Sequence, residues 1–350
     1  MKEYCPSRFE VSLPLLIGSG SLGNEVVTYY PSGEKVKKRL SSYLGALAAG
    51  AALLTVTACG GSATATPADE AGTITVEHAQ GTTDNVPVNP QKVFTFDLGV
   101  LDTLDALGVE PAGVPEAAYP DALSKYADGK YTKIGSLKEP DFEAVSAGDP
   151  DLIIISGRTA GAYEELSKIA PTIDLSIDAA GPMESFKEQT GKLGTIFGKS
   201  AEVEEKLAAV DAAIEETKTK AAGAGKGLIV LTSGGEVTAY GAGSRFGIIH
   251  DVLGVPAAAD VKVEGSHGEA VSFEYIKQVN PDILYVINRD TAVGTEGSSA
   301  NPILDNELVQ STNAAKNNKV INLDPAGWYI VGYGLNNVEA MVDAVADSVA

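Results

Sequence analysis

Three arginines are the residues of this sequence best suited to holding a charged ligand. From Cys59 onward the chain has 17 lysines but only three arginines, Arg158, Arg245 and Arg289. Arginine presents a permanent charge on a planar fork of donors, whereas lysine presents a mobile point charge. Ligands of open α/β sheets bind beyond the carboxyl ends of strands, and each arginine follows a predicted strand or a glycine-rich loop. We therefore expect the three to clamp one polyanion. The alternative is that they pair with some of the many carboxylates.

Two of these arginines end a phrase that occurs twice. Residues 141–158, DFEAVSAGDPDLIIISGR, align without a gap with residues 272–289, SFEYIKQVNPDILYVINR. Glu143 and Glu274 occupy equivalent positions at the start of the two predicted helices. The helix dipole favours a glutamate in a first turn by about 0.3–1 kcal/mol, which could account for either residue alone. The repetition predicts a chain with two similar halves.

The surrounding elements predict an α/β protein. In each half, short apolar runs bounded by Pro or Gly are typical of parallel strands covered on both faces. Helical segments alternate with these runs, as in two Rossmann-like lobes. Strands are expected at 92–97, 149–157, 226–232, 280–288 and 319–324, and helices with their loops at 99–114, 162–170 and 244–258. One helical face at the C-terminus carries a stripe of Val338, Met341, Val342, Val345 and Val349.

A long helical region is expected between the halves, at residues 183–222. Its apolar residues recur at helical spacing: Val203, Leu207, Val210 and Ile214. A helix of about 20 residues spans about 30 Å, the diameter of a small domain. The expected fold class is therefore α/β, with two Rossmann-like α/β lobes, 73–182 and 223–350, joined by a long α-helix. The alternative is two ordinary packing helices.

The first part of the chain resembles an export signal. Basic residues between Lys35 and Arg39 precede an apolar run of 13 residues, 44–56, and about 20 apolar residues are needed to span a bilayer. The sequence Val56-Thr57-Ala58-Cys59 resembles the bacterial lipobox, in which the cysteine is diacylated. We expect a lipoprotein signal peptide at 36–58, lipidation of Cys59 and a flexible tether at 59–72. Since a signal should open a chain, we interpret residues 1–35 as an untranslated or non-native extension.

The net charge and the cysteine content exclude some classes of partner and of metal site. The formal net charge is −21, and nucleic-acid binding requires a basic face, so nucleic acid is not an expected partner. The two cysteines are Cys5 and Cys59. The chain after Cys59 therefore has neither a disulfide scaffold nor a cysteine metal cluster.

Several phrases resemble the substrate-binding lipoproteins of ABC iron importers, in the subgroup that binds ferric catecholate siderophores. They run from about Gln91 to the C-terminus: FDLGVLDTLDALGVE, GSLKEPDFEAV, PDLIIISGR, ELSKIAPTI, GSRFGIIHDVLG, HGEAVSFEYI, LDNELV and LDPAGWYIVGYGL. The resemblance implies the class III substrate-binding-protein fold and a receptor rather than an enzyme. It implies no intrinsic cofactor, with a ferric siderophore as the transported ligand. The three arginines would neutralise the about three negative charges of a ferric tris-catecholate.

The resemblance also implies two iron ligands. In relatives that take tetra-coordinating siderophores, a histidine and a tyrosine fill the remaining iron positions. These roles carry over onto His267 in EGSHGEAV and Tyr329 in PAGWYIVGYG. Fe(III) favours phenolate oxygen and accepts imidazole. Tyr333 interrupts the glycines that usually follow the Trp-Tyr pair, which makes it a rival to Tyr329. A solvated loop histidine is the alternative for His267.

The partners and location follow from the same resemblance. In this receptor family one glutamate on each lobe docks onto arginines of the two permease subunits, and Glu143 and Glu274 occupy the matching positions. The expected protein is a monomer, anchored by lipid to the outer side of the cell membrane, that delivers its ligand to a permease with a cytoplasmic ATPase. The alternatives are a receptor for haem or a corrinoid and an exported hydrolase. The sequence has no nucleophile elbow, no Ser-His-Asp spacing and no HExxH helix.

Overall fold

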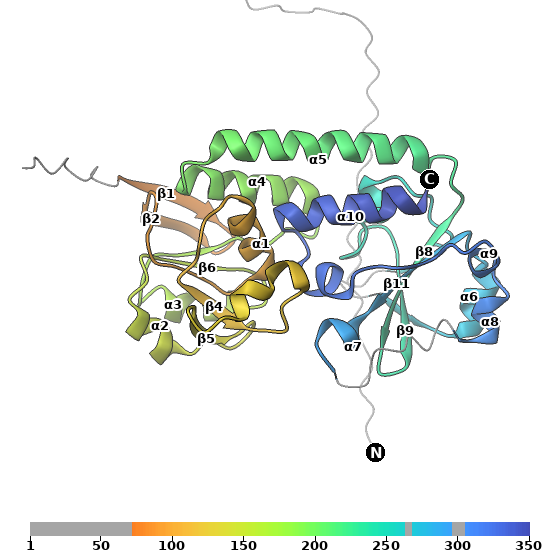
Figure 1. Ribbon diagram of the computed structural model, residues 1–350, viewed down its shortest axis with the longest axis horizontal. Helices are drawn as coiled ribbons and strands as arrows, with labels where there is room; N and C mark the ends of the chain where they lie inside the picture. Colours follow the sequence, from red (N-terminus) through yellow and green to blue (C-terminus); the bar gives the residue numbers. More distant parts are fainter. Residues whose placement is uncertain (1–71, 263–267, 296–304) are drawn as a thin grey trace, which may run out of the picture. The chain divides into compact units, whose positions relative to one another are not determined.

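The first half is organised around a fully parallel sheet. The computed structural model describes residues 72–262, 268–295 and 305–350 (Figure 1). Strand order is β5-β4-β3-β6-β7, the order of a doubly wound fold. Every side chain of β6 is fully buried, as expected for a strand covered on both faces. The elements are β3 (Val93–Thr95), α1 (Leu98–Ala106), β4 (Gly113–Glu116), β5 (Thr132–Ser136), α2 (Phe142–Gly148), β6 (Leu152–Ile155), α3 (Tyr163–Leu166) and β7 (Thr172–Asp174).

The second half has the same strand order but a different local topology. Its sheet runs β10-β9-β8-β11-β12, in which β8, β11 and β12 are parallel. β9 is antiparallel to β8 and to β10. The elements are β8 (Gly227–Ser233), β9 (Glu236–Tyr240), β10 (Glu269–Val271), α6 (Phe273–Val279), β11 (Ile283–Asn288), α7 (Arg289–Ala292), α8 (Glu307–Gln310), α9 (Asn313–Lys316) and β12 (Val320–Asn322).

One expectation for this half is wrong. Within the helix and loop predicted at 244–258, the helical part is a single π-helical turn, η3 (Ile248–Val252). The chain instead leaves β8 through a hairpin at Gly234 and Gly235, whose φ values are 58° and 85°. Two consecutive left-handed residues form the tight turn that matches the twist of paired strands, and glycine adopts them without steric cost. The hairpin replaces the helical crossover that alternation had predicted.

The repeated phrase has a repeated structure. In each copy, a short helix ends at a residue in the left-handed conformation, Asp149 (φ 49°) or Asn280 (φ 47°). Two residues later in each copy, an aspartate accepts hydrogen bonds from the backbone just before β3 or β8, the first strand of that sheet along the chain. Asp151 accepts hydrogen bonds from the backbone N–H groups of Gln91 and Lys92, both 2.8 Å. Asp282 accepts one from Lys226 N–H at 2.9 Å. The Pro-Asp pairs therefore fasten each helix–strand unit to its sheet.

Two helices, rather than one, occupy the region between the halves. They are α4 (Pro182–Ile196) and α5 (Ser200–Ala221), and the 22 residues of α5 span roughly 33 Å at 1.5 Å per residue. Figure 1 shows α4, α5 and the C-terminal α10 (Leu335–Ser348) side by side. Phe186 of α4 packs in the core of the second half, and Leu193 of α4 packs in that of the first. α4 therefore contributes to both cores. None of the described helices is long and apolar enough to cross a membrane.

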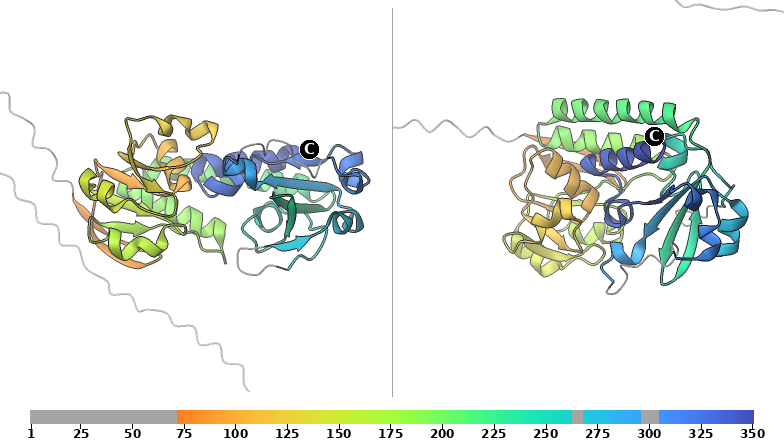
Figure 2. Two further views of the ribbon diagram at one scale, coloured as in Figure 1. Left: turned by 90° about the horizontal axis from the view of Figure 1, so that it is seen from below. Right: turned by 45° about the vertical axis from the view of Figure 1, so that its right-hand side comes forward.

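A hairpin that the sequence reading missed lies at the edge of the first sheet. It consists of β1 (Thr73–His78) and β2 (Gly81–Pro87). The Thr83 hydroxyl donates to Thr172 O (2.7 Å) and accepts from His78 Nε2 (2.8 Å). Gln80 Nε2 donates to Asp174 Oδ2 at 2.8 Å. These contacts attach the hairpin to β7. Figure 2 shows the hairpin, in orange, from two further sides.

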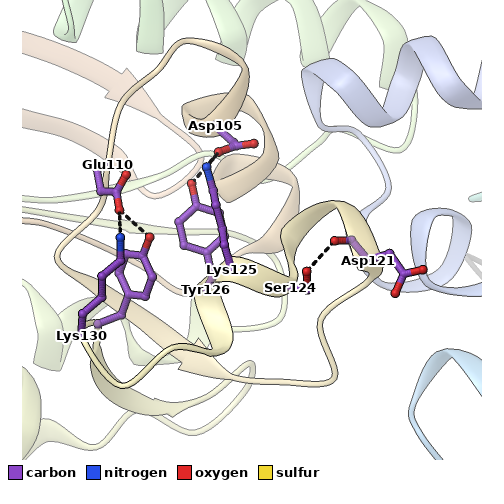
Figure 3. Close-up of polar contacts among 8 residues, drawn as sticks. Asp105, Glu110, Asp121, Ser124, Lys125, Tyr126 and Lys130 are labelled. Carbon is purple, nitrogen blue, oxygen red and sulfur yellow. Dashed lines mark hydrogen bonds and ion pairs between the residues drawn. The ribbon is translucent and has the colours of Figure 1, made fainter.

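The irregular segment between β4 and β5 is fastened to the end of α1. It contains the 3₁₀ helix η1 (Asp121–Ala127). Figure 3 shows that Lys125 and the Tyr126 hydroxyl both meet Asp105, while Lys130 pairs with Glu110 at 2.7 Å. Exposed ion pairs contribute about 0–1 kcal/mol each, so the buried Tyr126 ring supplies more of the attachment.

The first turn of α10 is capped by side chains of α1. Asp102 Oδ2 accepts from Asn336 N–H (2.8 Å) and Asn337 N–H (3.0 Å), and the Thr103 hydroxyl accepts from Leu335 N–H (3.1 Å). A Cβ at Gly334 would lie 2.5 Å from Asp102 Oδ2, so only glycine allows this approach. The first N–H groups of a helix have no partner within it. Here the first half supplies the partners for a helix of the second half.

This cap leads to a prediction on pH dependence. Asp102 is 3% exposed, and burial raises its pKa to about 6. The folded protein therefore binds the proton more tightly than the unfolded chain does. The stability from this group is complete below pH about 4 and is lost as pH rises through about 6. Between pH 5 and pH 7.5 the free energy of unfolding should fall by about 1 kcal/mol on this account.

Chemical denaturation of Asp102→Asn at both pH values measures the effect. The amide oxygen retains the cap and carries no charge, so this component of the pH dependence should disappear. Asp102→Ala should lose about 1 kcal/mol at both pH values because the cap itself is lost. An Asp102→Asn protein with the wild-type pH dependence would assign the effect to another group.

Candidate functional site

Three guanidinium groups meet at one residue, Tyr329. Arg158 follows β6, Arg245 lies between β9 and η3, and Arg289 begins α7 directly after β11. Arg158 Nη2 and Arg245 Nη2 both donate to the carbonyl oxygen of Tyr329, each at 2.9 Å. Arg289 Nε donates to the Tyr329 hydroxyl at 2.8 Å. The structure therefore brings the three predicted arginines together, and it does so around a main-chain carbonyl and a phenol.

The ring of Tyr329 adds to this arrangement. The Arg245 guanidinium carbon lies 4.6 Å from the ring centroid, and that of Arg289 lies 5.6 Å away. A cation within about 6 Å of an aromatic face is attracted by roughly 0.5–2 kcal/mol. Burial, with the nearby positive charge of Arg158, lowers the pKa of Arg245. Arginine still stays protonated, so the site retains its positive charge.

The position of Tyr329 is fixed by its own segment, η4 (Gly327–Val331), a π-helical turn. The Asn337 amide of α10 donates to Gly327 O (2.9 Å) and Gly332 O (2.6 Å), and Asp324 accepts from Gly327 N–H (2.8 Å). Asn337 also donates its backbone N–H to Asp102. One chain of hydrogen bonds therefore runs from α1 through α10 to the residue that the arginines share.

Arg289 has partners of its own beside Tyr329. Its Nη1 donates to the Ser233 hydroxyl at 3.2 Å and lies 3.8 Å from Asp290 Oδ1. Asp290 in turn accepts from Gly234 N–H at 2.6 Å. Part of the charge of Arg289 is therefore offset, whereas Arg158 has only carbonyl acceptors among its described hydrogen-bond partners.

A cavity of about 370 Å³ opens beside the arginines. Arg158 and Arg245 form part of its wall, together with Tyr329. Trp328, the single tryptophan of the chain, also lines it and is 3% exposed. Most of the remaining wall is apolar and comes from α1, α4, η4 and the segment after β7: Val100, Leu175, Ile177, Phe186, Leu193, Ile330 and Val331. A cavity with a cationic edge and apolar walls suits an anion that carries aromatic or aliphatic groups.

One carboxylate shares this cavity with the arginines. Asp97 Oδ1 caps α1 by accepting from Gly99 N–H (2.9 Å) and Val100 N–H (3.0 Å). Burial raises the pKa of Asp97, against the opposing effects of these N–H groups and of Arg158. Its first role is therefore structural, because it holds the start of the helix that forms one wall.

The other predicted site residues lie in different places. His267 and Cys59 lie outside the described residues. Glu143 and Glu274 are exposed in the first turns of α2 and α6 and do not line the cavity. Tyr333 does line the cavity, packed against Phe186 with ring centroids 6.1 Å apart. Within the described ranges, no group of three or more His, Cys, Asp or Glu residues could hold a metal ion.

Sequence reasoning missed the shared acceptor and most of the apolar wall. A main-chain carbonyl has no sequence signal, because every residue carries one. Phe186 and Leu193 do lie on one face of the predicted helical region, so periodicity marks them as buried. It does not show that part of that face lines a cavity.

The chain is similar to known proteins over most of its length. The family model described as periplasmic binding protein matches residues 93–326. The petrobactin-binding protein YclQ of Bacillus subtilis is 46% identical over 301 residues, 83% of this chain and 94% of that protein. Its crystal structure, 47% identical, covers 79% of this chain and 98% of that chain with a TM-score of 0.76. The catecholate-siderophore-binding protein VctP of Vibrio cholerae is 39% identical, with a TM-score of 0.73 over 78% and 99% of the two chains.

The expected fold class is thereby confirmed: two α/β lobes of the class III substrate-binding type. The likeness to relatives covers both lobes and nearly the whole length of each solved relative, and the family consists of binding proteins rather than enzymes. This chain belongs to the periplasmic binding protein family.

Proposed function

We propose that the protein is an extracytoplasmic receptor that captures a ferric siderophore of the catecholate type and delivers it to an ABC permease. The observation that carries this proposal is the convergence of three guanidinium groups on Tyr329 beside a largely apolar cavity. A ferric tris-catecholate combines about three negative charges with aromatic rings, which matches both features. Two relatives support the ligand class, because one is named for petrobactin and another for catecholate siderophores.

Tyr329 provides the three arginines with acceptors of the kind that an anion would provide. Its carbonyl oxygen takes one donor from each of Arg158 and Arg245. An incoming catecholate oxygen carries a full or partial negative charge, and hydrogen bonds to an ionised acceptor are about twice as strong as neutral ones. The ligand would therefore compete favourably for the same donors.

Arginine substitutions test the ligand class. Arg158→Ala and Arg245→Ala should each weaken binding of a ferric tris-catecholate by roughly 30-fold or more, since a lost partner of a buried charge pair costs about 2–5 kcal/mol. Arg289→Ala should weaken it less, because the Arg289 side chain is 41% exposed and does not line the cavity. Isothermal titration calorimetry gives the affinities. Arg158→Lys keeps the charge without the fork and should recover only part of the loss. Lys277→Ala, an exposed cation on α6, is the charge control. Wild-type affinity in all three alanine variants would overturn the catecholate proposal.

The same titrations examine the iron ligands. Tyr329→Phe keeps the carbonyl that holds Arg158 and Arg245 and removes only the hydroxyl. We propose that this hydroxyl and His267 bind the iron at the coordination positions that a four-coordinate siderophore leaves open. Tyr329→Phe and His267→Ala should weaken such complexes and change their charge-transfer absorption, while complexes of hexadentate siderophores are spared. An equal loss for both ligand types would exclude direct coordination.

Docking to the permease is proposed for Glu143 and Glu274. Both are exposed in first turns of equivalent helices, and Phe142 beside Glu143 is 41% exposed. The double variant Glu143→Ala, Glu274→Ala should keep its siderophore affinity and lose iron uptake in cells that lack any other receptor. Glu204→Ala with Glu205→Ala removes the same charge from exposed positions on α5 and should transport normally. Normal uptake by the first pair would contradict the docking role.

The lipid anchor is proposed for Cys59, because its lipobox-like context follows a signal-like apolar run. Cys59→Ser should shift the protein from the membrane fraction to the soluble fraction, since two acyl chains are needed for stable anchoring. Fractionation followed by immunoblotting measures this. Cys5→Ser should have no effect on the distribution. Membrane retention of Cys59→Ser equal to that of the unmodified sequence would argue against the anchor.

A further inference from the structure

The wall that α4 contributes to the cavity carries an amide side chain, Gln189. Gln189 is half-buried, so its side chain is accessible from the cavity mouth. Its Oε1 accepts a hydrogen bond from Lys192 Nζ at 3.1 Å. A lysine ammonium can only donate, so the amide oxygen faces Lys192 and the amide NH₂ group faces the other way. Among the described residues, this NH₂ group has no acceptor.

The turn of α4 decides on which side the NH₂ group lies. Successive residues of an α-helix are about 100° apart around its axis, so Lys192 lies about 60° to one side of Gln189. Phe186 and Leu193 lie on the other side, at about 60° and 40°. Both are buried and line the cavity, whereas Lys192 pairs with the exposed Glu188 at 2.8 Å. The amide oxygen therefore points to the solvent side of α4, and the NH₂ group points to the cavity side.

The surroundings limit what this NH₂ group can bind. The neighbouring wall is apolar, so it offers dispersion contacts and no charge. Lys192 is already paired with Glu188, so it offers little compensation for a negative charge. A neutral amide donor in such a wall suits a neutral oxygen, such as the carbonyl of an amide or ester. Arg158 and Arg245, which also line the cavity, suit the charged part of a ligand.

We propose that Gln189 is a specificity-determining residue, whose Nε2 donates a hydrogen bond to a neutral carbonyl oxygen on an arm of the ligand. The ligand class is a ferric catecholate whose rings carry amide or ester arms. This inference rests on the proposed function, because the arginines hold the charged part of the same molecule. It adds a second point of recognition on α4, and this point distinguishes arms that carry a carbonyl from arms that are purely aliphatic.

Two ferric complexes of equal charge and arm length test the hydrogen bond. One is the ferric tris complex of N-propyl-2,3-dihydroxybenzamide, and the other is that of 3-pentylcatechol, whose arm has the same chain length without a carbonyl. Calorimetry is done with free catechol in excess, which keeps the tris complexes intact. Gln189→Met keeps the length of the side chain and removes the donor. It should weaken the amide complex by about 5- to 10-fold, the effect of one neutral hydrogen bond, and change the pentyl complex by less than about twofold.

Controls distinguish this role from a structural one. Gln278→Met makes the same change at an exposed position of α6, outside the cavity wall, and should alter neither affinity. Arg158→Ala should weaken both complexes. Because Gln189 is half-buried and methionine is a good helix former, the melting temperature of Gln189→Met should stay close to that of the wild type. A drop in melting temperature together with equal loss of both ligands would assign Gln189 to folding and overturn the inference.

The outcomes also separate this inference from the proposed function. If the wild-type protein binds neither complex, the catecholate function fails and the role of Gln189 fails with it. If both complexes bind in an arginine-dependent way and Gln189→Met has no selective effect, only the role of Gln189 fails. If Gln189→Met weakens both complexes equally without loss of stability, the amide contacts the catecholate ring or its oxygens, which also overturns the proposal.

Discussion

Three permanent positive charges lie close together in this protein, at Arg158, Arg245 and Arg289. Two unit charges 4 Å apart near a protein surface interact by about 4 kcal/mol, so an uncompensated cluster would spread apart. Tyr329 prevents this with three different parts of one residue. Its carbonyl oxygen accepts from Arg158 and Arg245, its hydroxyl accepts from Arg289, and its ring faces two of the guanidinium groups. One residue therefore holds the three guanidinium groups together.

This constraint links both halves of the chain. Arg158 extends from the first sheet to a carbonyl of the second half, and Asp102 extends from α1 to the first turn of α10. Asn337 joins the two contacts. Its backbone N–H donates to Asp102, and its side-chain amide donates to the carbonyl oxygen of Gly327 in the segment that carries Tyr329. A change in the spacing of the lobes would therefore disturb the arginines, the cap and the cavity wall together. The helices α4 and α5 limit such changes, since α4 packs into both cores.

The parts of the structure that the sequence predicted are those with a period, a repeat or a rare residue type. The stripe on α10, the buried strands β6 and β11 and the three arginines all have such signals. The hairpin at Gly234 and Gly235 was not predicted, because the alternation of strands and helices led us to expect a helix, and not a second strand, after β8. The role of the Tyr329 carbonyl as a shared acceptor depends on tertiary packing, which a single sequence does not encode in any local pattern. His267 stays a prediction, because it lies outside the described residues.

The place of Trp328 has an optical consequence. The chain contains one tryptophan, and that residue precedes Tyr329 and lines the cavity. Its indole is 3% exposed, so the ring is shielded from water. The tryptophan emission of the protein therefore originates from a single buried position next to the shared acceptor. A rearrangement of the segment Gly327–Val331 would alter the surroundings of this one fluorophore, with no background from other tryptophans.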